Sequence, residues 1–551
     1  MSTRTIAGLL RRRAESMSGD VAIRFKEDPG FEAWTWLRFW EEAVRVAAGL
    51  REAGLRPGDR VLVLVPEVKA AVTTLFGIWS LGAVPIPIGL PFRLTDIEGF
   101  LEQLRKTADK LSARALVTSR ALAAFAGAPG AVRVLCAEEL SMAPHGFSPD
   151  PDAAPGPALI QLTSGSTGHP RGVVLGHERL MLHMACMSEA LPSHAESVAV
   201  SWLPLHHDMG LIGGLLFPFY NGFVANMLAP QDFRARPLAW LEAMSSLRAT
   251  ICAAPPSAYA LILRLARRAA EAGLDLRAWE CAMIGAEPIS PGLLQRFAQA
   301  FRPVGFRAEA FFPVYGLAEA TVAVTFPKLL APSRFAVVDR ETLERTGRAV
   351  PTEPGPHALE LTCVGRSIPQ TDVRITGDEG EVLPERQVGE IEVRAPTLMH
   401  EYLDDPTATA GVFRDGYLRT GDLGYLDAGE LFVTGRKKDL IIKGGHNLLP
   451  SVIEEIVSEV EDVRSGCVVA VGARAEADET ELVYVIAETK LDRGAHDALG
   501  ERVRAALLVR GIGVDRVMFL APGTLPKTTS GKLRRRAVAE ALAQGRSLES
   551  A

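Results

Sequence analysis

The sequence predicts an α/β fold: a large N-terminal domain of mainly parallel α/β subdomains plus a small β-rich subdomain, followed by a small mobile α+β C-terminal domain. Apolar runs of strand length alternate with longer helical stretches through the first half of the chain, and this alternation is typical of parallel sheets. Further along, short strands and turns replace the alternation. The length of 551 residues exceeds what one hydrophobic core supports, so we expect the chain to divide.

The first half contains short apolar runs with the composition of buried strands, and longer stretches with helical periodicity lie between several of them. Two apolar stretches, 70–90 and 211–230, approach the length of a membrane-spanning helix but are interrupted by Pro85 and Pro218. We expect a buried helix followed by a strand in each. The other expected strands are 60–65, 115–118, 132–136, 159–163 and 198–203, and the expected helices include 40–53, 100–111 and 238–246.

The sequence of the second half of the chain predicts two further structural units. From about residue 365 to 425, short strands alternate with turns such as 377–380, which indicates a β-rich subdomain. After Gly435, a charged step precedes a compact α+β unit, and we therefore divide the chain into residues 1–435 and 436–551. In this last unit we expect helices at 451–460 and 495–508 and strands at 467–471 and 482–487.

Composition and charge argue against nucleic-acid partners and integral membrane association. The 60 basic residues are interspersed among 66 acidic ones, which leaves a net charge of -6 and no broad basic face. At the N-terminus, two leucines precede three arginines, the reverse of the order in a secretory signal. The six cysteines stand singly, so we expect buried thiols in a reducing, cytoplasmic compartment. They are Cys136, Cys186, Cys252, Cys281, Cys363 and Cys467.

A loop rich in glycine and hydroxyl side chains follows one apolar run and precedes another. Its glycines let the backbone N–H groups approach an anion, and its hydroxyls supply further donors for phosphate oxygens. By itself, such a loop is about as often a simple linker. The candidate phosphate-binding residues are Thr163, Ser164, Gly165, Ser166, Thr167 and Gly168.

Spacing excludes two familiar kinds of glycine loop. A Walker A loop needs Gly-Lys-Ser/Thr after four intervening residues, but Pro170 follows Gly165 by five positions, and Val173 follows Gly168 by five. A nucleophile elbow needs a serine with glycine two residues away on both sides, and no serine of the loop meets this condition. We therefore expect neither P-loop nor serine-hydrolase chemistry here.

Three further segments carry side chains suited to a nucleotide. Tyr315 and Glu319 can present a stacking face and an oxygen ligand to one site. Asp422 ends a strand with a carboxylate that can accept hydrogen bonds from a sugar diol. Lys532 lies on a hydroxyl-rich loop and can deliver a point charge to a phosphate. Considered singly, these segments more often have ordinary structural roles. The first is then a core tyrosine with a surface carboxylate, the second a turn aspartate and the third a solvated lysine.

Together, in this order and at these separations, the four segments resemble the adenylate-forming superfamily of acyl-CoA synthetases, nonribosomal adenylation domains and luciferases. Further matches are the segments 284–288 (Ile-Gly-Ala-Glu-Pro), 435–439 (Gly-Arg-Lys-Lys-Asp) and 445–450 (Gly-His-Asn-Leu-Leu-Pro). The resemblance therefore spans nearly the whole chain, and the agreement of all segments outweighs the ordinary interpretation of each.

Within the superfamily, residues 201–211 (Ser-Trp-Leu-Pro-Leu-His-His-Asp-Met-Gly-Leu) are most similar to the fatty acyl-AMP ligases. Ala318 stands where many relatives carry threonine, and the stretch 337–358 resembles the insertion that distinguishes these ligases from acyl-CoA synthetases. A metal site at His206, His207 and Asp208 is the alternative, but the sequence places no further ligand. A condensation motif fails because the aspartate follows the histidine pair directly.

The resemblance implies a reaction in two halves. A fatty carboxylate attacks the α-phosphate of ATP to give acyl-adenylate and pyrophosphate, and the phosphopantetheine thiol of an acyl carrier protein then displaces AMP. ATP and Mg2+ are the implied cofactors. The protein's main tasks are to bring two anions together and to stabilise the charge that grows on the phosphates.

The resemblance also implies a role for each matching residue. Residues 163–168 would hold the β- and γ-phosphates, and Glu319 would bind Mg2+ together with Thr167. Lys532 would bridge the carboxylate and the α-phosphate, and His207 would line the junction of the acyl and nucleotide sites. Lys438 would be the hinge of the C-terminal domain. The implied nucleotide site further includes Gly285, Ala286, Glu287, Tyr315 and Gly316 around adenine, and Asp422 and Arg436 at the ribose.

Three positions depart from the ligase pattern, and the last of them leaves the acceptor open. Arg171 replaces the usual lysine of the phosphate loop, and His206 stands where the ligases mostly have tyrosine. Residues 444–450 are closer to acyl-CoA synthetases, so a synthetase acting on medium or long chains is the alternative. An inactive adenylate-binding scaffold is a third hypothesis, but such a scaffold would have no need of Lys532.

Overall fold

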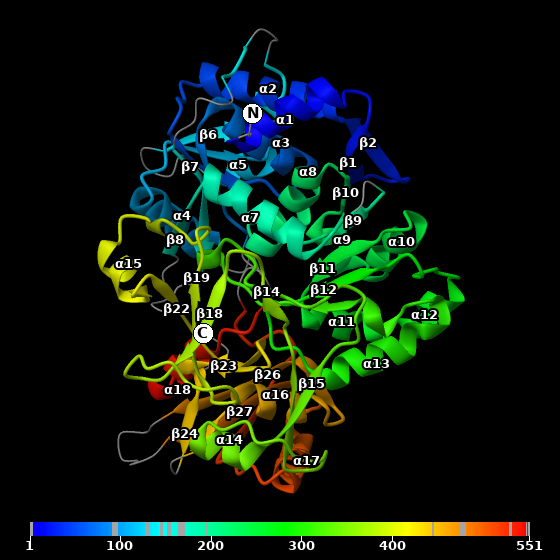
Figure 1. Cartoon of the computed structure of the whole chain (residues 1–551), viewed down its shortest axis with the longest axis vertical. Helices are drawn as coiled ribbons and strands as arrows, with labels where there is room; N and C mark the ends of the chain where they lie inside the picture. The colour runs from blue at the N-terminus through cyan, green and yellow to red at the C-terminus, as the bar shows by residue number, and fades with distance from the viewer. Residues whose placement is uncertain are drawn as a thin grey trace.

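The computed structural model of the protein is shown in Figure 1. The N-terminal half of the chain (blue to green) occupies the upper part of the view, and the C-terminal unit (orange to red) occupies the lower part. The described residues are 4–90, 97–126, 132–143, 147–150, 156–163, 171–193, 196–443, 446–473, 481–527, 532–546 and 548.

Two mainly parallel sheets form the centre of the N-terminal region. The larger one runs, strand by strand, β13 (Phe311–Pro313), β12 (Cys281–Ile284), β11 (Ile251–Ala254), β9 (Val198–Ser201), β10 (Val224–Met227), β1 (Val21–Lys26) and β2 (Phe31–Thr35). Its neighbouring strands are parallel except β1 with β2. The second sheet is parallel throughout and runs β4 (Val84–Pro87), β3 (Arg60–Leu64), β5 (Ala115–Thr118) and β6 (Arg133–Cys136). The predicted fold class is confirmed.

The helices of this region bury apolar faces against the two sheets, which gives one extended core and a second, smaller apolar cluster on the four-stranded sheet. At the end of α3 (Val68–Leu81), Gly82 takes the left-handed conformation (φ 78°) that lets the chain turn directly into β4. The other helices are α1 (Ile6–Ser16), α2 (Trp36–Glu52), α4 (Ile97–Lys110), α5 (Arg120–Ala126), α6 (Ala137–Leu140), α7 (His177–Ala190), α8 (Phe217–Asn221), α9 (Pro230–Ala235), α10 (Leu238–Ser246), α11 (Pro256–Leu263), α12 (Ala266–Glu271) and α13 (Pro291–Phe301).

Both interrupted apolar stretches adopt the predicted helix followed by a strand. Residues 70–90 contain α3 and β4, and residues 211–230 contain most of the π-helix η1 (Met209–Leu216), then α8 and β10. No helix in the part of the chain that the structure describes is long and apolar enough to span a membrane. The β1–β2 hairpin was not expected, because the polar residues at the ends of these strands obscure the apolar pattern.

Antiparallel sheets make up the rest of this region. Most of the five-stranded one lies in the turn-rich stretch 365–425, as predicted, whereas the strand expected at 159–163 pairs antiparallel and does not join a parallel sheet. A three-stranded sheet consists of β7 (Pro157–Thr163), β8 (Arg171–Gly176) and β20 (Glu401–Tyr402), with β8 in the middle. A five-stranded sheet consists of β18 (Asp372–Thr376), β19 (Gly389–Arg394), β22 (Tyr417–Asp427), β21 (Phe413–Arg414) and β23 (Glu430–Arg436). α15 (Pro406–Val412) lies between β20 and β21 along the chain, and a two-stranded sheet pairs β14 (Thr325–Phe326) with β17 (Arg366–Ser367).

The C-terminal unit has the predicted order of helix, two strands and helix, with its own apolar clusters. These elements are α16 (Pro450–Ser458), β26 (Val463–Ala473), β27 (Leu482–Thr489) and α17 (His496–Val509), and the hairpin of β24 (Ile441–Lys443) and β25 (His446–Leu448) precedes them. Two elements that the sequence analysis missed complete the unit: β28 (Arg516–Leu520), parallel to β27, and α18 (Arg535–Ala543). The division at residue 435 stays a prediction.

The stretch that resembles a ligase insertion lies against the C-terminal unit. It contains α14 (Arg340–Thr346) and lies between β15 (Phe335–Asp339) and β16 (Ala358–Thr362), which pair with each other. The buried Arg340 forms an ion pair of 2.9 Å with Glu344 and donates a hydrogen bond to the carbonyl oxygen of Arg510. Leu343 belongs to the same apolar cluster as Leu449. The stretch therefore bridges the two parts of the chain.

Candidate active site

Three of the side chains predicted for the nucleotide site meet directly. The hydroxyl of Tyr315 donates a hydrogen bond of 2.8 Å to Oδ2 of Asp422. On the other side of this carboxylate, Nε of Arg436 lies 2.9 Å from Oδ1. Tyr315 and Asp422 are buried, whereas 53% of the Arg436 side chain is exposed. The aspartate is thus held in one orientation, with an exposed cation beside it.

The strands around this cluster explain its geometry. Asp422 and Arg436 are direct partners in the antiparallel pairing of β22 with β23. Gly421 precedes the aspartate with φ 72°, a left-handed conformation that glycine adopts without strain. The hydroxyl of Thr420 accepts a hydrogen bond from the backbone N–H of Asp422 at 3.1 Å. These features direct the carboxylate toward Tyr315, which follows β13 on the neighbouring sheet.

The small residues predicted near adenine lie where the backbone is crowded. Gly285 follows β12, and a Cβ atom added there would be 2.8 Å from the Val314 side chain. At Gly316, an added Cβ would be 1.7 Å from the carbonyl oxygen of Val322. Ala286 has φ 68°, an unfavourable value for a residue with a side chain. This strain next to Tyr315 indicates a site that demands close backbone approach.

Glu287 has a different environment from its predicted neighbours. Its two carboxylate oxygens accept hydrogen bonds from the backbone N–H and the hydroxyl of Ser257, at 3.0 and 3.1 Å. Ser257 lies in the first turn of α11. The side chain of Glu287 therefore binds the start of a helix, and the structure does not bring it to Asp422 or Glu319.

The carboxylate of Glu319 has one oxygen engaged by a tyrosine that the sequence analysis did not identify. The hydroxyl of Tyr402 donates a hydrogen bond of 2.7 Å to Oε1. Burial raises the pKa of Glu319, and the Tyr402 hydrogen bond opposes this rise. A single buried carboxylate fits Mg2+, which proteins usually hold through one or two carboxylates and the phosphates of a substrate. Thr167, its predicted co-ligand, lies outside the described residues.

Lys532 of the C-terminal unit exerts an electrostatic effect on His207 of the N-terminal region. Burial, and then the positive charge of Lys532, lower the pKa of His207 to about 4, so its imidazole is neutral near pH 7. The same lysine opposes the rise that burial causes in the pKa of Asp208. Lys532 is therefore within electrostatic reach of both side chains. A β-bridge between Lys527 and Leu533 closes the base of its loop.

Asp208, which the sequence analysis considered only as part of an alternative metal site, lies in the same environment. Its carboxylate accepts a hydrogen bond of 2.7 Å from the N–H of Met209, the first residue of η1. It also contributes to raising the pKa of Glu319, which places the two carboxylates in the same electrostatic environment. A carboxylate directly after the predicted His207 was the signal that could have identified it. Within the described ranges, no group of three His, Cys, Asp or Glu side chains is arranged to bind a metal ion.

Some of the remaining predicted residues lie at the edge of the candidate site, and the others lie outside the described residues. Thr163 ends β7 and pairs with Arg171 at the base of the phosphate-loop hairpin. Lys438 lies in the short 3-10 helix Lys437–Asp439, directly after β23, and is exposed. Outside the described residues lie Ser164, Gly165, Ser166, Thr167 and Gly168, and also Gly444 and Gly445.

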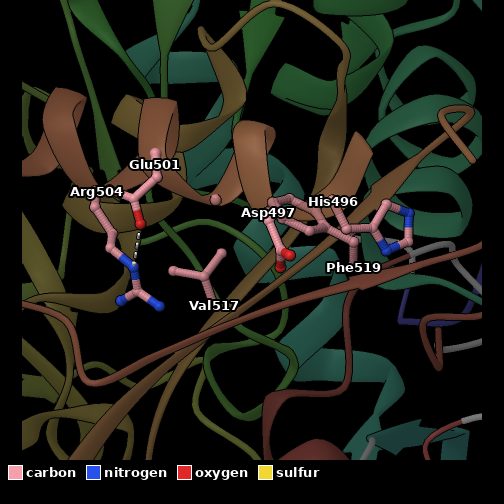
Figure 2. A pocket seen from close by; sticks show the side chains of 7 residues that line it. His496, Asp497, Glu501, Arg504, Val517 and Phe519 are labelled. Carbon is pink, nitrogen blue, oxygen red and sulfur yellow. Dashed lines mark ion pairs between the residues drawn. The ribbon is translucent and has the colours of Figure 1, made fainter. Parts of the chain in front are cut away.

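Further contacts join the C-terminal unit to the N-terminal region. Glu455 of α16 accepts a hydrogen bond from the hydroxyl of Ser290, and Arg296 of α13 lies 3.1 Å from Glu459. A separate pocket of about 270 Å³ lies on α17 and β28 (Figure 2). Its walls include His496 and Phe519. None of the predicted site residues lines this pocket.

Known proteins are similar to this chain over most of its length. A putative acyl-CoA synthetase of Caulobacter vibrioides is 34% identical over 520 residues, covering 92% of this chain and 89% of that protein. A medium-chain fatty acid acyl-carrier-protein ligase of Moorena producens is 31% identical over 562 residues, covering 97% and 94%.

Solved structures of fatty acyl-adenylate ligases are also similar to this chain. A structure from a study of fatty acyl-adenylate ligases of E. coli and L. pneumophila has a TM-score of 0.91 at 30% identity, covering 99% of both chains. The L. pneumophila ligase in complex with acyl adenylate and pyrophosphate has a TM-score of 0.74 at 29% identity, covering 98% of this chain and 96% of that one. The AMP-binding enzyme family matches residues 10–403, and this chain belongs to that family.

Proposed function

We propose that this protein activates a fatty acid with ATP and transfers the acyl group to the phosphopantetheine thiol of an acyl carrier protein. The observation that carries the proposal is the approach of Lys532, from the C-terminal unit, to His207 and Asp208. A cation delivered by a second domain suits a reaction between two anions. We further propose a role in lipid metabolism in the cytoplasm, a reducing compartment in which the six free cysteines would stay unpaired.

In the first half-reaction, a carboxylate oxygen of the fatty acid attacks the α-phosphorus of ATP, the bond to the β-phosphate breaks and pyrophosphate leaves. Asp422 accepts hydrogen bonds from the ribose hydroxyls, and the neighbouring Arg436 offsets its charge. Lys532 offsets the charge of the attacking carboxylate and the α-phosphate. Glu319 would hold Mg2+, which when bound neutralises charge on the phosphate oxygens. The neutral His207 adds no charge at the junction with the acyl chain.

In the second half-reaction, the thiol sulfur attacks the acyl carbonyl, AMP leaves with its phosphate and the thiol proton passes to solvent. Lys532 must withdraw to admit the thiol, so the C-terminal unit rotates about Lys438.

Four observations bear on the acceptor. The insertion-like stretch packs on the C-terminal unit through Arg340, and the Moorena relative is named an acyl-carrier-protein ligase, which both favour the carrier protein. Residues 446–450 and the name of the Caulobacter relative favour coenzyme A instead. We therefore keep acyl-CoA synthesis as the second candidate.

One experiment separates the two acceptors. The purified protein is incubated with ATP, Mg2+ and a panel of fatty acids, then chased with coenzyme A or with phosphopantetheinylated carrier protein, and the products are identified by mass spectrometry. We expect the acyl group to reach the carrier protein but not free coenzyme A. Efficient acyl-CoA formation would assign the second candidate, and absence of any acyl-adenylate would overturn both.

Asp422→Asn should weaken ATP binding. The amide keeps the shape of the side chain but removes the negative charge. The native carboxylate pairs with Arg436 and accepts a hydrogen bond from Tyr315. Hydrogen bonds to charged groups contribute about 1.5–3 kcal/mol, so we expect the KM for ATP to rise roughly 10- to 100-fold. The measurement is pyrophosphate exchange at varied ATP concentration.

Asp372→Asn is the matched control for this prediction. Asp372 also accepts a hydrogen bond from a tyrosine hydroxyl, Tyr417, and also pairs with an arginine, Arg394, at 3.0 Å. It lies on β18, and 52% of its side chain is exposed. The control should leave the KM for ATP unchanged. Equal effects of both substitutions would mean that Asp422 acts only through stability.

A further inference from the structure

Tyr402 occupies an unusual place beside the predicted phosphate loop. Its short strand β20 pairs antiparallel with β8, and Tyr402 lies directly opposite Val173. Strand β8 begins with Arg171, two residues earlier, so the side chains of Arg171 and Val173 leave the same face. Tyr402 is therefore part of the sheet that carries the phosphate loop.

This one side chain contacts two charged groups of opposite sign. Its hydroxyl donates the 2.7 Å hydrogen bond to Glu319, and the guanidinium of Arg171 lies over its ring, 5.1 Å from the centroid. Arg171 and Glu319 come from different parts of the chain, the first from the hairpin of β7 and β8 and the second from the 3-10 helix η4 (Ala318–Ala320). Tyr402 joins them.

The backbone around Tyr402 is tied firmly to the segment that carries Glu319. The N–H of Met399 donates to the carbonyl oxygen of Glu319 at 2.8 Å, and the hydroxyl of Thr321 donates to the carbonyl oxygen of Thr397 at 2.5 Å. The buried His183 contacts both sides, with Nδ1 3.1 Å from the Thr397 hydroxyl and Nε2 accepting from the N–H of Ala323 at 3.2 Å. These bonds hold Tyr402 at a set distance from Glu319.

We propose that Tyr402 is a positioning residue that orients the metal-binding carboxylate of Glu319 and holds Arg171 at the phosphate loop. The inference rests on the proposed function. A hydroxyl bound to Oε1 fixes the orientation of the carboxylate, as partners of metal ligands commonly do. It also accounts for arginine at position 171, because a planar guanidinium stacks on a tyrosine ring better than a lysine ammonium does.

Tyr402→Phe tests the hydroxyl alone, because the ring stays to support Arg171. We expect Mn2+ to bind the ATP complex of the variant roughly 10-fold more weakly or worse, measured directly by electron paramagnetic resonance. The half-saturating fatty acid concentration for adenylate formation should change less than about twofold, since the acyl site is untouched. Wild-type Mn2+ affinity in the variant would overturn the proposal.

Tyr417→Phe is the matched control. The Tyr417 hydroxyl also donates to a carboxylate, that of Asp372, and its ring also lies under an arginine, Arg374, at 3.7 Å. This constellation is in the β-rich subdomain, apart from Glu319, so we expect unchanged Mn2+ affinity. A loss equal to that of Tyr402→Phe would show that removing any such hydroxyl weakens the protein generally, and would overturn the specific role.

Arg171 is tested by a double-mutant cycle with Tyr402→Leu, which removes the ring. Arg171→Lys should raise the KM for ATP in the wild-type background and have a smaller effect beside Tyr402→Leu. Equal effects in both backgrounds would overturn the coupling. If the leucine variant does not fold, the Mn2+ result for Tyr402→Phe decides alone. Because Mn2+ binding needs no fatty acid, failure of the proposed activity is distinguishable from failure of this inference.

Discussion

Replacement of Lys532 by alanine is expected to lower the rate of acyl-adenylate formation by roughly 10² to 10³, the usual cost of removing one stabilising group from a charged transition state. The ammonium lies within electrostatic reach of His207 and Asp208, and nothing else in the C-terminal unit is predicted to offset the charge of the fatty carboxylate. The rate is measured in a single turnover by quenching and mass spectrometry.

Two further measurements sharpen this prediction. When chemically prepared acyl-adenylate is supplied, Lys532→Ala should transfer its acyl group at the wild-type rate, because the lysine withdraws before the thiol arrives. Lys527→Ala is the control, since Lys527 lies on the same loop but donates to the Cys467 sulfur at 3.5 Å. Equal losses in both half-reactions would mean that Lys532 supports the fold of the C-terminal unit instead.

Lys438→Pro is expected to abolish acyl transfer while adenylate formation stays within a factor of about two, because proline fixes φ at the residue about which the domain would rotate. The contacts of the described arrangement, such as Arg296 with Glu459, need no movement at this position. Both half-reactions are measured separately, the second with a phosphopantetheinylated carrier protein.

The control for the hinge is Lys438→Ala, which removes the same charged side chain but keeps the freedom of the backbone. We expect this variant to retain both half-reactions. If alanine and proline abolish transfer equally, the side chain of Lys438 matters and the hinge does not. If proline reduces adenylate formation as strongly as transfer, the idea of two domain arrangements is wrong.

Local patterns predicted much of the fold and part of the site. Alternation of apolar runs and helical stretches is sufficient to identify strands such as β3 and β5, since each is completely apolar apart from its ends. The motifs around Tyr315, Asp422 and Lys532 were identified because each carries its chemistry in a few adjacent residues. The hairpin β1–β2 was missed because its charged residues, such as Lys26 and Glu32, hide the alternation.

The sequence by itself determined the fold class, the family resemblance and which side chains are chemically competent. Only the tertiary structure decided which of them meet. Tyr402 and Glu319 are 83 residues apart, and no local period connects them; β20 brings them together by adding to the hairpin of β7 and β8. Likewise, Lys532 reaches His207 only because the C-terminal unit lies against the N-terminal region. These contacts depend on the order of the strands and on the packing of the domains. Interactions between residues distant in sequence determine both, and local sequence patterns do not encode them.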